Sequence, residues 1–189
     1  MLKRPLQIRI DAETALCVPT EKDAEAIYQL IQANNAYLRQ WLPWIDFTQS
    51  IEDERAYIHS TLLQYQDNQS ITFVLWYQGQ IVGSIGYHPF DWLNRRVELG
   101  YWLAQPYQGK GLMTRACQTL ITYAFSELKM NKVEIRCATG NTASAAIPQR
   151  LGFTQEGIIR QAEWLYDHYV DLSLFGLLES EWRQQRTDR

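Results

Sequence analysis

The sequence predicts an α/β protein with a mixed β-sheet flanked by helices, and three observations support this fold class. Apolar residues recur at helical spacing in several stretches and alternate with polar residues in others. The period changes from helical to extended at Ile71. A strand, a helix and a second strand then follow one another over residues 96–138, which is typical of a parallel unit with a right-handed crossover.

The first part of the chain reads as a hairpin followed by two capped helices. Residues 7–10 and 15–18 are apolar runs around a polar break, which predicts a small hairpin. Thr20 with Asp23, and Ser50 with Asp53, have the spacing of helix starts, and the second predicts a helix over residues 50–66. Residues 34–47 between them hold four aromatics within eleven residues. These aromatics either pack together or form a hydrophobic clamp over a substrate.

The remainder of the chain alternates extended and helical patterns. Residues 71–77 and 81–87 flank a Gly79 turn and predict two antiparallel strands. A third strand over residues 96–103 carries Glu98 in the middle of an otherwise apolar run. Residues 179–189 form a charged tail without a clear signal. The other predicted elements are a helix over 112–128, a strand over 132–138, a short helix over 141–151, and strands over 153–160 and 168–178.

Length and composition narrow the class of protein. A chain of 189 residues with 46% apolar residues can bury its own core, so we expect one domain over residues 1–189. The net charge of −3, from 18 basic and 21 acidic residues, offers no broad cationic surface, so we expect no nucleic-acid partner. Neither a signal peptide nor a membrane-spanning run is present, which favours the cytoplasm. The three cysteines (Cys17, Cys117 and Cys137) have no metal-ligand spacing, so we expect reduced thiols and no metal.

The stretch from Tyr101 to Thr114 carries the strongest functional signal. An apolar strand end is followed by Pro106, a glycine loop at residues 109–111, and a helix start. Such a loop leaves backbone N–H groups and the positive end of the helix dipole facing outward, which suits an anion such as phosphate, although it is also an ordinary turn in many proteins. The Walker and dinucleotide-binding motifs are not present.

Two motifs resemble those of the GNAT N-acetyltransferases. Gln108-Gly-Lys-Gly-Leu-Met113 is similar to the family signature Q/R-x-x-G-x-G/A, with Met113 in the place of Gly or Ala. Further along, residues 141–153 resemble the family's N-x-x-[SA]…K/R-x-GF helix. The resemblance covers about residues 6–180. It implies a mixed, mostly antiparallel sheet of about seven strands, with a splayed fourth and fifth strand pair. It also implies that the protein uses acetyl-coenzyme A.

The resemblance narrows to the RimL/RimJ group. Many GNAT enzymes have a tyrosine acid where this chain has Pro148. The form of residues 144–153, the aromatic residues 38–44 and the run at residues 160–163 are similar to RimL and RimJ. That group includes enzymes that acetylate N-terminal α-amines of ribosomal proteins, together with many relatives of unassigned substrate, and the resemblance also suggests a homodimer. Because proline lacks an N–H group, we expect the helix turn after Ser144 to open.

The resemblance implies which residues bind the cofactor. In the family the glycine loop binds the pyrophosphate, and the preceding strand pairs with the pantetheine arm. The expected cofactor contacts are Tyr101, Trp102, Leu103, Gln108, Gly109, Lys110, Gly111, Leu112, Met113, Thr114, Asn141 and Ser144.

The catalytic candidates are two carboxylates and a hydroxyl. Attack by an amine requires its neutral form, so a carboxylate that accepts a proton contributes to rate. Glu98, on an apolar strand, is the first candidate for this base, and Glu163, from the RimL-like run, is the second. For either of them an ion pair with an arginine (Arg96, Arg136 or Arg160) is the alternative. Ser144 is expected to assist departure of the thiolate, unless its hydroxyl only bonds its own helix backbone.

The acceptor is the least determined part of the prediction. His88 and His168 are further candidates for a base. Trp41, Trp44, Tyr87 and Glu98 are expected to line the acceptor pocket. The alternatives to a ribosomal protein are a small amine, such as a polyamine, an amino acid or an aminoglycoside, and a coenzyme A-binding sensor with little catalysis. A pure interaction domain is the remaining alternative, and only a failure to bind cofactor would favour it.

Overall fold

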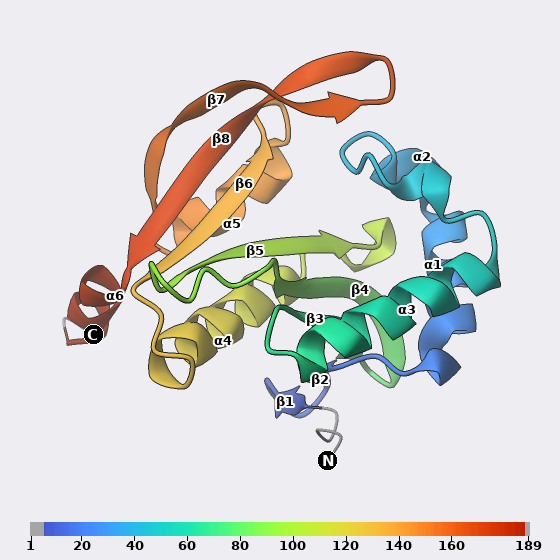
Figure 1. The fold of residues 1–189 in the computed structure, drawn as a ribbon, viewed down its shortest axis with the longest axis horizontal. Coiled ribbons are helices and arrows are strands. Elements are labelled where there is room, and N and C mark those ends of the chain that lie inside the picture. Colours follow the sequence, from blue (N-terminus) through green and yellow to red (C-terminus); the bar gives the residue numbers. More distant parts are fainter. Residues whose placement is uncertain (1–5, 188–189) are drawn as a thin grey trace. The chain divides into compact units, whose positions relative to one another are not determined.

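A computed structural model describes residues 6–187 of the chain. It is an α/β structure whose eight strands form a sheet in the order β1-β2-β3-β4-β5-β6-β8-β7 (Figure 1). The sequence predicted about seven strands, and the mixed, mostly antiparallel sheet with flanking helices is confirmed. The chain divides into two compact units, and β5 and α4 contribute to both. The single domain predicted over residues 1–189 stays a prediction, and residues 1–5 and 188–189 lie outside the described part.

The first unit comprises the chain up to Tyr87 together with Tyr101–Ala116. Within it, α1 and α3 pack against each other and against β4 and β3 respectively (Figure 1). Its elements are β1 (Gln7–Arg9), β2 (Thr14–Cys17), η1 (Glu21–Asp23), α1 (Ala24–Ala33), α2 (Asn35–Leu38), η2 (Ile45–Phe47), α3 (Ile51–Gln66), β3 (Ile71–Tyr77), β4 (Gln80–Tyr87), the end of β5 (Arg96–Leu103), η3 (Gln105–Tyr107) and the start of α4 (Leu112–Ser126).

Local sequence signals explain most of the first unit. Both predicted capping boxes are present, with Thr20 and Asp23 before α1 and with Ser50 and Asp53 at the start of α3. These side chains satisfy backbone N–H groups that have no partner within the helix. The aromatic segment at residues 34–47 packs largely onto the apolar cluster formed by α1, α3, β3 and β4. Phe47 does not pack there, since 78% of it is exposed.

The second unit comprises His88–Gly100 together with the chain from Cys117 onward. Its elements are the start of β5, the rest of α4, β6 (Lys132–Ala138), α5 (Thr142–Arg150), β7 (Thr154–Leu165), β8 (His168–Leu178) and α6 (Glu179–Thr187). α5 contacts β6 and β7, and α6 contacts β8. In this unit the sequence missed α6, because residues 179–187 have no apolar repeat. The helix is held instead by Trp182, whose ring lies 5.3 Å from that of Phe125.

Two features of strand pairing shape the second unit. β5 and β6 are parallel, and their register pairs Arg96–Leu99 with Lys132–Ile135, so pairing covers the first four residues of each strand. The splay that the family resemblance implies for a fourth and fifth strand pair stays a prediction. β7 and β8 form a long antiparallel hairpin (Figure 1). Its register shifts between Ile159 and Glu163, where β7 has residues 160–162 and β8 has only Asp171.

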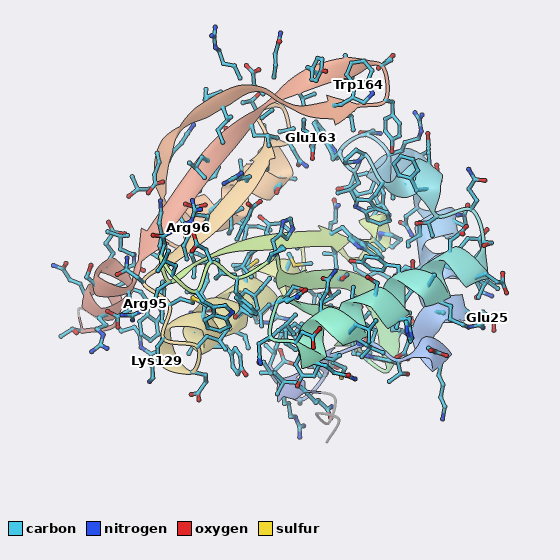
Figure 2. The ribbon with its side chains drawn as sticks, viewed as in Figure 1. Glu25, Arg95, Arg96, Lys129, Glu163 and Trp164 are labelled. Carbon is cyan, nitrogen blue, oxygen red and sulfur yellow. The ribbon has the colours of Figure 1, made fainter. Side chains whose placement is uncertain are left out.

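This irregularity has a defined local structure. Gln161 adopts a positive φ of 47°, and its backbone N–H donates to Asp171 Oδ1 over 2.7 Å. Extra residues on an edge strand bend it and interrupt regular pairing. The outer end of the hairpin, with Glu163 and Trp164, lies beyond this point (Figure 2). Over residues 6–187 the structure has no helix long and apolar enough to cross a membrane.

Candidate active site

The glycine loop of the first unit is anchored by side chains on three sides. The backbone N–H of Gln105 donates to Asn34 Oδ1 over 3.0 Å, and the Tyr107 hydroxyl donates to Gln80 Oε1 over 2.9 Å. The Gln108 amide donates to the Tyr37 hydroxyl. Because these partners belong to α1, α2 and β4 or lie beside them, the loop has a defined position at the start of α4.

The backbone of the loop suits an anion. Gly109 and Gly111 have positive φ values of 73° and 69°, a region that glycine adopts without strain. A Cβ added at Gly109 would meet nothing within 4 Å, so the loop is open at this point. The first N–H groups of α4 have no acceptor within the helix, and the helix dipole adds positive potential there. The residues therefore fit the pyrophosphate for which the sequence suggested this loop.

Two cations flank the glycines. Lys110 Nζ lies 5.5 Å from the ring centroids of both Tyr77 and Tyr107, which holds it by cation–π contact. Arg115 donates to the carbonyl oxygen of Lys110 over 3.1 Å and lies 3.3 Å from Asp11. Sequence reasoning missed Arg115. Its position four residues after Gly111, in the first turn of the predicted helix, was the available signal, since that turn lies beside the anion site.

The other predicted residues of the first unit are partly or fully buried. Leu112 and Met113 are buried, so Met113 packs into the core at the position where the family motif has a small residue. Trp44 and Trp102 are partly buried and bring their rings to 6.4 Å. Tyr87 is only 2% exposed, and its role in an acceptor pocket stays a prediction. The remaining predicted positions here, all partly buried, are Trp41, Tyr101, Leu103 and Thr114.

In the second unit, Asn141 and Ser144 form the start of α5. Asn141 Oδ1 accepts from the Ser144 backbone N–H over 3.1 Å and caps the helix. α5 continues as a helix through Pro148, so the opened turn predicted from the proline is wrong. The Ser144 hydroxyl is hydrogen-bonded to Cys137 on β6. Burial raises the pKa of the Cys137 thiol, and this hydrogen bond opposes the effect. All three cysteines are free thiols, as predicted.

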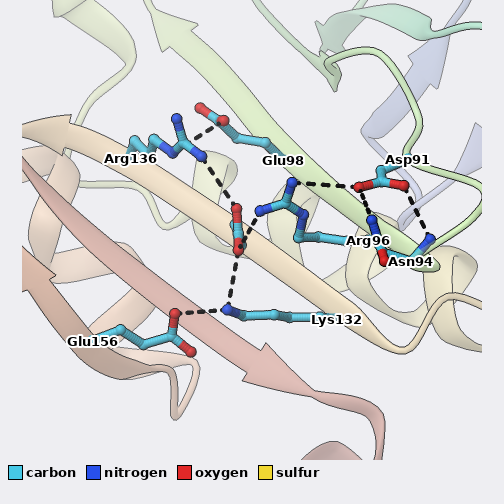
Figure 3. Close-up of polar contacts among 8 residues, drawn as sticks. Asp91, Asn94, Arg96, Glu98, Lys132, Arg136 and Glu156 are labelled. Carbon is cyan, nitrogen blue, oxygen red and sulfur yellow. Dashed lines mark hydrogen bonds and ion pairs between the residues drawn. The ribbon is translucent and has the colours of Figure 1, made fainter. Parts of the chain in front are cut away.

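Glu98 has the arginine partner that was the alternative to its role as a base. Its Oε2 lies 3.3 Å from Arg136 Nε, and its Oε1 lies 3.9 Å from His88 Nδ1. Arg96, another candidate partner, instead lies near Asp91 and the buried Glu134 (Figure 3). The sequence could suggest an arginine for Glu98 but could not choose among three of them.

Glu163 lies on β7 near the turn of the hairpin (Figure 2). Its side chain is partly buried, whereas Trp164 beside it is 51% exposed and contacts the ring of Tyr169 on β8 at 4.8 Å. Burial raises the pKa of Glu163, and the negative charge of Glu98 raises it further. A carboxylate in this environment is a better proton acceptor than a free one.

The histidines and acids form no further candidate centre. His168 lies at the exposed hairpin turn and contacts Asp167 at 2.6 Å, while His88 contacts Glu98. Among residues 6–187 no three His, Cys, Asp or Glu side chains are grouped so that they could hold a metal ion. The second unit therefore pairs Glu98 with Arg136, and separately brings together Cys137, Asn141 and Ser144.

Comparison with known proteins identifies the family of these motifs. Residues 15–154 match the model of the acetyltransferase (GNAT) domain. The chain is 40% identical to the Bacillus subtilis (strain 168) protein named "Putative ribosomal N-acetyltransferase YdaF", over 87% of this chain and 91% of that protein. It is 32% identical to the ribosomal-protein-serine acetyltransferase of Escherichia coli (strain K12), over 89% of this chain and 94% of that enzyme.

A solved structure gives the same result at the level of the fold. The ribosomal L7/L12 alpha-N-protein acetyltransferase RimL in complex with coenzyme A superposes with a TM-score of 0.89. The two chains are 27% identical, and the match covers 93% of this chain and 99% of RimL.

Proposed function

Because the chain belongs to the GNAT family and is an N-acetyltransferase that uses acetyl-coenzyme A, we propose that its acceptor is the N-terminal α-amine of a ribosomal protein. The observation that carries this proposal is the likeness, over nearly the whole chain, to enzymes whose names specify ribosomal proteins. The ionisation of an α-amine is compatible with the carboxylate of Glu163 in the second unit as a proton acceptor. An α-amine has a pKa of about 8, so roughly a quarter of it is neutral at pH 7.5, and a carboxylate can accept the proton that the attacking amine releases.

Residues of each unit, taken separately, are candidates for contacts with acetyl-coenzyme A. In the first unit, the N–H groups of Gly109 to Met113, together with Lys110 and Arg115, bind the pyrophosphate. The strand end Tyr101–Leu103 pairs with the pantetheine arm. In the second unit, Asn141 holds the start of α5 so that the Ser144 hydroxyl faces the thioester sulfur. Acetyl-coenzyme A supplies the activated acetyl group.

The reaction is a direct transfer within a ternary complex. The acceptor nitrogen attacks the thioester carbonyl carbon, and Glu163 takes the proton that the nitrogen releases. As the carbon–sulfur bond breaks, the Ser144 hydroxyl turns its hydrogen bond from Cys137 to the departing thiolate, which then takes a proton from solvent and leaves as the thiol. Glu163 is preferred to Glu98 as the base because the Glu98 carboxylate is already held by Arg136.

Transfer to peptides tests the acceptor. We expect acetylation of peptides that copy N-termini of ribosomal proteins, and no acetylation of the same peptides with a blocked N-terminus, even when they contain lysine. A higher kcat/KM for spermidine, an amino acid or an aminoglycoside would contradict the proposal. Stabilisation by acetyl-coenzyme A without transfer to any acceptor would instead indicate a sensor.

Two substitutions test the roles of the side chains. We expect Glu163→Gln to lower kcat by about 10²- to 10⁴-fold, since this is the usual contribution of a positioned base. Ser144→Ala should lower kcat with little change in the KM for acetyl-coenzyme A. The matched control is Glu156→Gln, on the same strand, which should leave turnover unchanged. Normal turnover by both Glu163→Gln and Ser144→Ala would show that these assignments are wrong.

We further propose that the enzyme works in the cytoplasm as a homodimer. The support for this is the family resemblance and the site of ribosome assembly that the proposed acceptor implies. Sedimentation of the purified chain at micromolar concentration measures its mass, and a monomer at all concentrations would contradict the dimer. Fractionation of cells that express a tagged chain tests the compartment.

A further inference from the structure

The side chain of Asn34 joins α1 and α2 to the turn that leads into the glycine loop. It is 9% exposed, its Oδ1 accepts from the backbone N–H of Gln105 over 3.0 Å, and its Nδ2 donates to the carbonyl oxygen of Leu30 over 2.8 Å. Its own carbonyl oxygen accepts from the backbone N–H of Tyr37, so the same residue ends α1 and begins α2 (Figure 1). A buried amide that is bonded at both ends keeps its orientation, because turning it would leave buried polar groups without partners.

Two further contacts tie the aromatic segment to the residues before the glycine loop. The side-chain amide of Gln108 donates to the Tyr37 hydroxyl, and the centroids of the Trp44 and Trp102 rings lie 6.4 Å apart. Together with the bond to the buried amide, these contacts occur at both ends and in the middle of residues 102–108. The two segments therefore hold each other along their length, and all of these residues belong to the first unit.

The glycine loop depends on such contacts for its position. Gly109 and Gly111 have no side chain that could hold the backbone, and glycine has more conformational freedom than any other residue. An anion site made of backbone N–H groups binds best when these groups are already aligned, because ordering them on binding costs free energy. Gln105 and Gln108, which come shortly before the glycines, are the points at which the aromatic segment fixes the loop.

We infer that Asn34 and Tyr37 are positioning residues that couple binding of the cofactor to binding of the acceptor. They hold the glycine loop in the form that binds the pyrophosphate. Through the same bonds, the bound cofactor holds the aromatic segment, whose Trp41 and Trp44 are the predicted lining of the acceptor pocket. Freedom that one ligand has removed does not have to be removed again by the other, so each ligand strengthens binding of the other. The inference rests on the proposed function for both of these ligand contacts.

Amide hydrogen exchange with and without coenzyme A tests the coupling without any acceptor. In the wild type, we expect saturating coenzyme A to slow exchange in residues 34–47 by about tenfold more than in α3. The helix α3 is the internal reference for the general stabilisation that any ligand gives to the folded state. Tyr37→Phe should reduce the extra slowing by at least about half, because it deletes the hydroxyl that accepts from Gln108. Equal slowing in the two regions of the wild type, or undiminished extra slowing in Tyr37→Phe, would overturn the inference.

The affinity for coenzyme A provides a second readout. In titration calorimetry, Tyr37→Phe should raise the Kd by about two- to tenfold, which is the effect of one hydrogen bond. In steady-state kinetics the KM for acetyl-coenzyme A should rise by a similar factor, whereas kcat should change by less than about twofold, since the bond is the same in the ground state and the transition state. A lower kcat with an unchanged KM would place Tyr37 in the chemical step and overturn the inference.

Tyr28→Phe is the matched control on α1. The Tyr28 hydroxyl donates to the carbonyl oxygen of Gln49 over 2.9 Å, so its loss removes a hydrogen bond of the same helical region without touching the loop. It should leave the Kd and the exchange pattern unchanged. Equal effects of Tyr28→Phe and Tyr37→Phe would show a general loss of helix packing and overturn the inference.

Two more variants test the route of the coupling. If Tyr37 acts through Gln108, the double variant Tyr37→Phe/Gln108→Leu should raise the Kd no more than the larger of its two single substitutions, and fully additive effects would overturn the inference. Asn34→Ala should act in the same direction as Tyr37→Phe and more strongly, because it leaves two backbone groups without their partner. Thermal unfolding checks that Asn34→Ala folds, and Tyr37→Phe decides the matter where it does not. If peptides are not acetylated at all, the proposed acceptor fails, whereas exchange and calorimetry with coenzyme A still decide the roles of Asn34 and Tyr37.

Discussion

Two buried glutamates, one in each unit, have opposite surroundings. Glu54 on α3 is 4% exposed and Glu134 on β6 is 3% exposed, so water reaches them equally little. Glu134 lies within 3.5 Å of Arg96, Lys132 and Arg136. For Glu54 the described residues provide no ion pair, and its pKa is shifted by burial alone.

The pKa values of these two equally buried glutamates are therefore shifted in opposite directions. Desolvation raises the pKa of Glu54 from its ordinary value of 4.5 to about 7. Burial also pushes the pKa of Glu134 upward, but the hydrogen bond and charge of Lys132 and the charges of Arg96 and Arg136 outweigh it, and the pKa is lowered. The partners of a buried carboxylate, and not its exposure, therefore decide which form the fold stabilises.

Among the variants that test this comparison, Glu134→Gln should produce the largest change in the free energy of unfolding. It leaves three cations around a neutral amide, so we expect the free energy of unfolding to fall by about 3–5 kcal/mol at pH 7. Urea unfolding measures this loss. Because the pKa of Glu134 is lowered, its contribution is present above pH 4.5 and is lost as pH falls through the folded pKa, so the deficit should shrink in acid.

The control for this variant is Glu156→Gln. Glu156 also contacts Lys132 but is partly exposed, and its loss should cost less than about 1 kcal/mol. If the two variants lose equal stability, the buried position of Glu134 has no special importance.

Glu54→Gln should have a somewhat smaller effect, of opposite sign. The folded pKa of about 7 exceeds the unfolded value of 4.5, so wild-type stability is full below pH 4.5 and falls as pH rises to 7. The fall amounts to about 3 kcal/mol, and a neutral glutamine avoids most of it. We expect the variant to be more stable than wild type at pH 8 and similar at pH 4.5, measured by thermal and urea unfolding.

Glu52→Gln is the matched control on the same helix. The Glu52 side chain is 77% exposed, so its substitution should leave the fall in stability between pH 4.5 and pH 7 as it is in the wild type. A Glu54→Gln variant that keeps that fall would refute the assignment.

Ser50→Ala should have the smallest effect, about 1 kcal/mol of destabilisation. Ser50 accepts from the Asp53 backbone N–H over 3.1 Å and caps α3, the helix that carries Glu54. The loss should not depend on Glu54, so the fall in stability between pH 4.5 and pH 7 should persist in urea titrations of the variant. Disappearance of that fall would mean that the whole helix, and not Glu54, responds to pH.

Where the signals are local, the sequence predicted the fold well. Capping boxes at Thr20 and Ser50, strand alternation after Ile71, and the glycine turn at residue 79 all act within a few residues. α6 was missed because a tertiary contact through Trp182 holds it. On β6, Glu134 is buried although it is charged, because cations from β5 and β6 surround it, and this arrangement is visible only in the tertiary structure.

The candidate site likewise has parts that local motifs predicted and parts that depend on tertiary contacts. Family motifs located the glycine loop and the helix at Asn141, and both have the geometry those motifs require. Arg115 and the contact of Cys137 with Ser144 were missed because their relevance depends on which side chain lies beside them. From the sequence alone, three arginines were equally good partners for Glu98, and only the pairing of β5 with β6 selects Arg136.

The shift in register on β7 makes the orientation of Glu163 depend on the number of residues before it. Between Ile159 and Glu163 the strand advances four positions while β8 advances two, and both counts are even. Successive strand residues face opposite sides, so one residue more or fewer in 160–162 would exchange the places of Glu163 and Trp164. An indole would then stand where a carboxylate stood. In this segment the number of residues therefore constrains which side chain faces the site as strictly as residue identity does. Relatives can be grouped by the number of residues between the positions of Ile159 and Glu163.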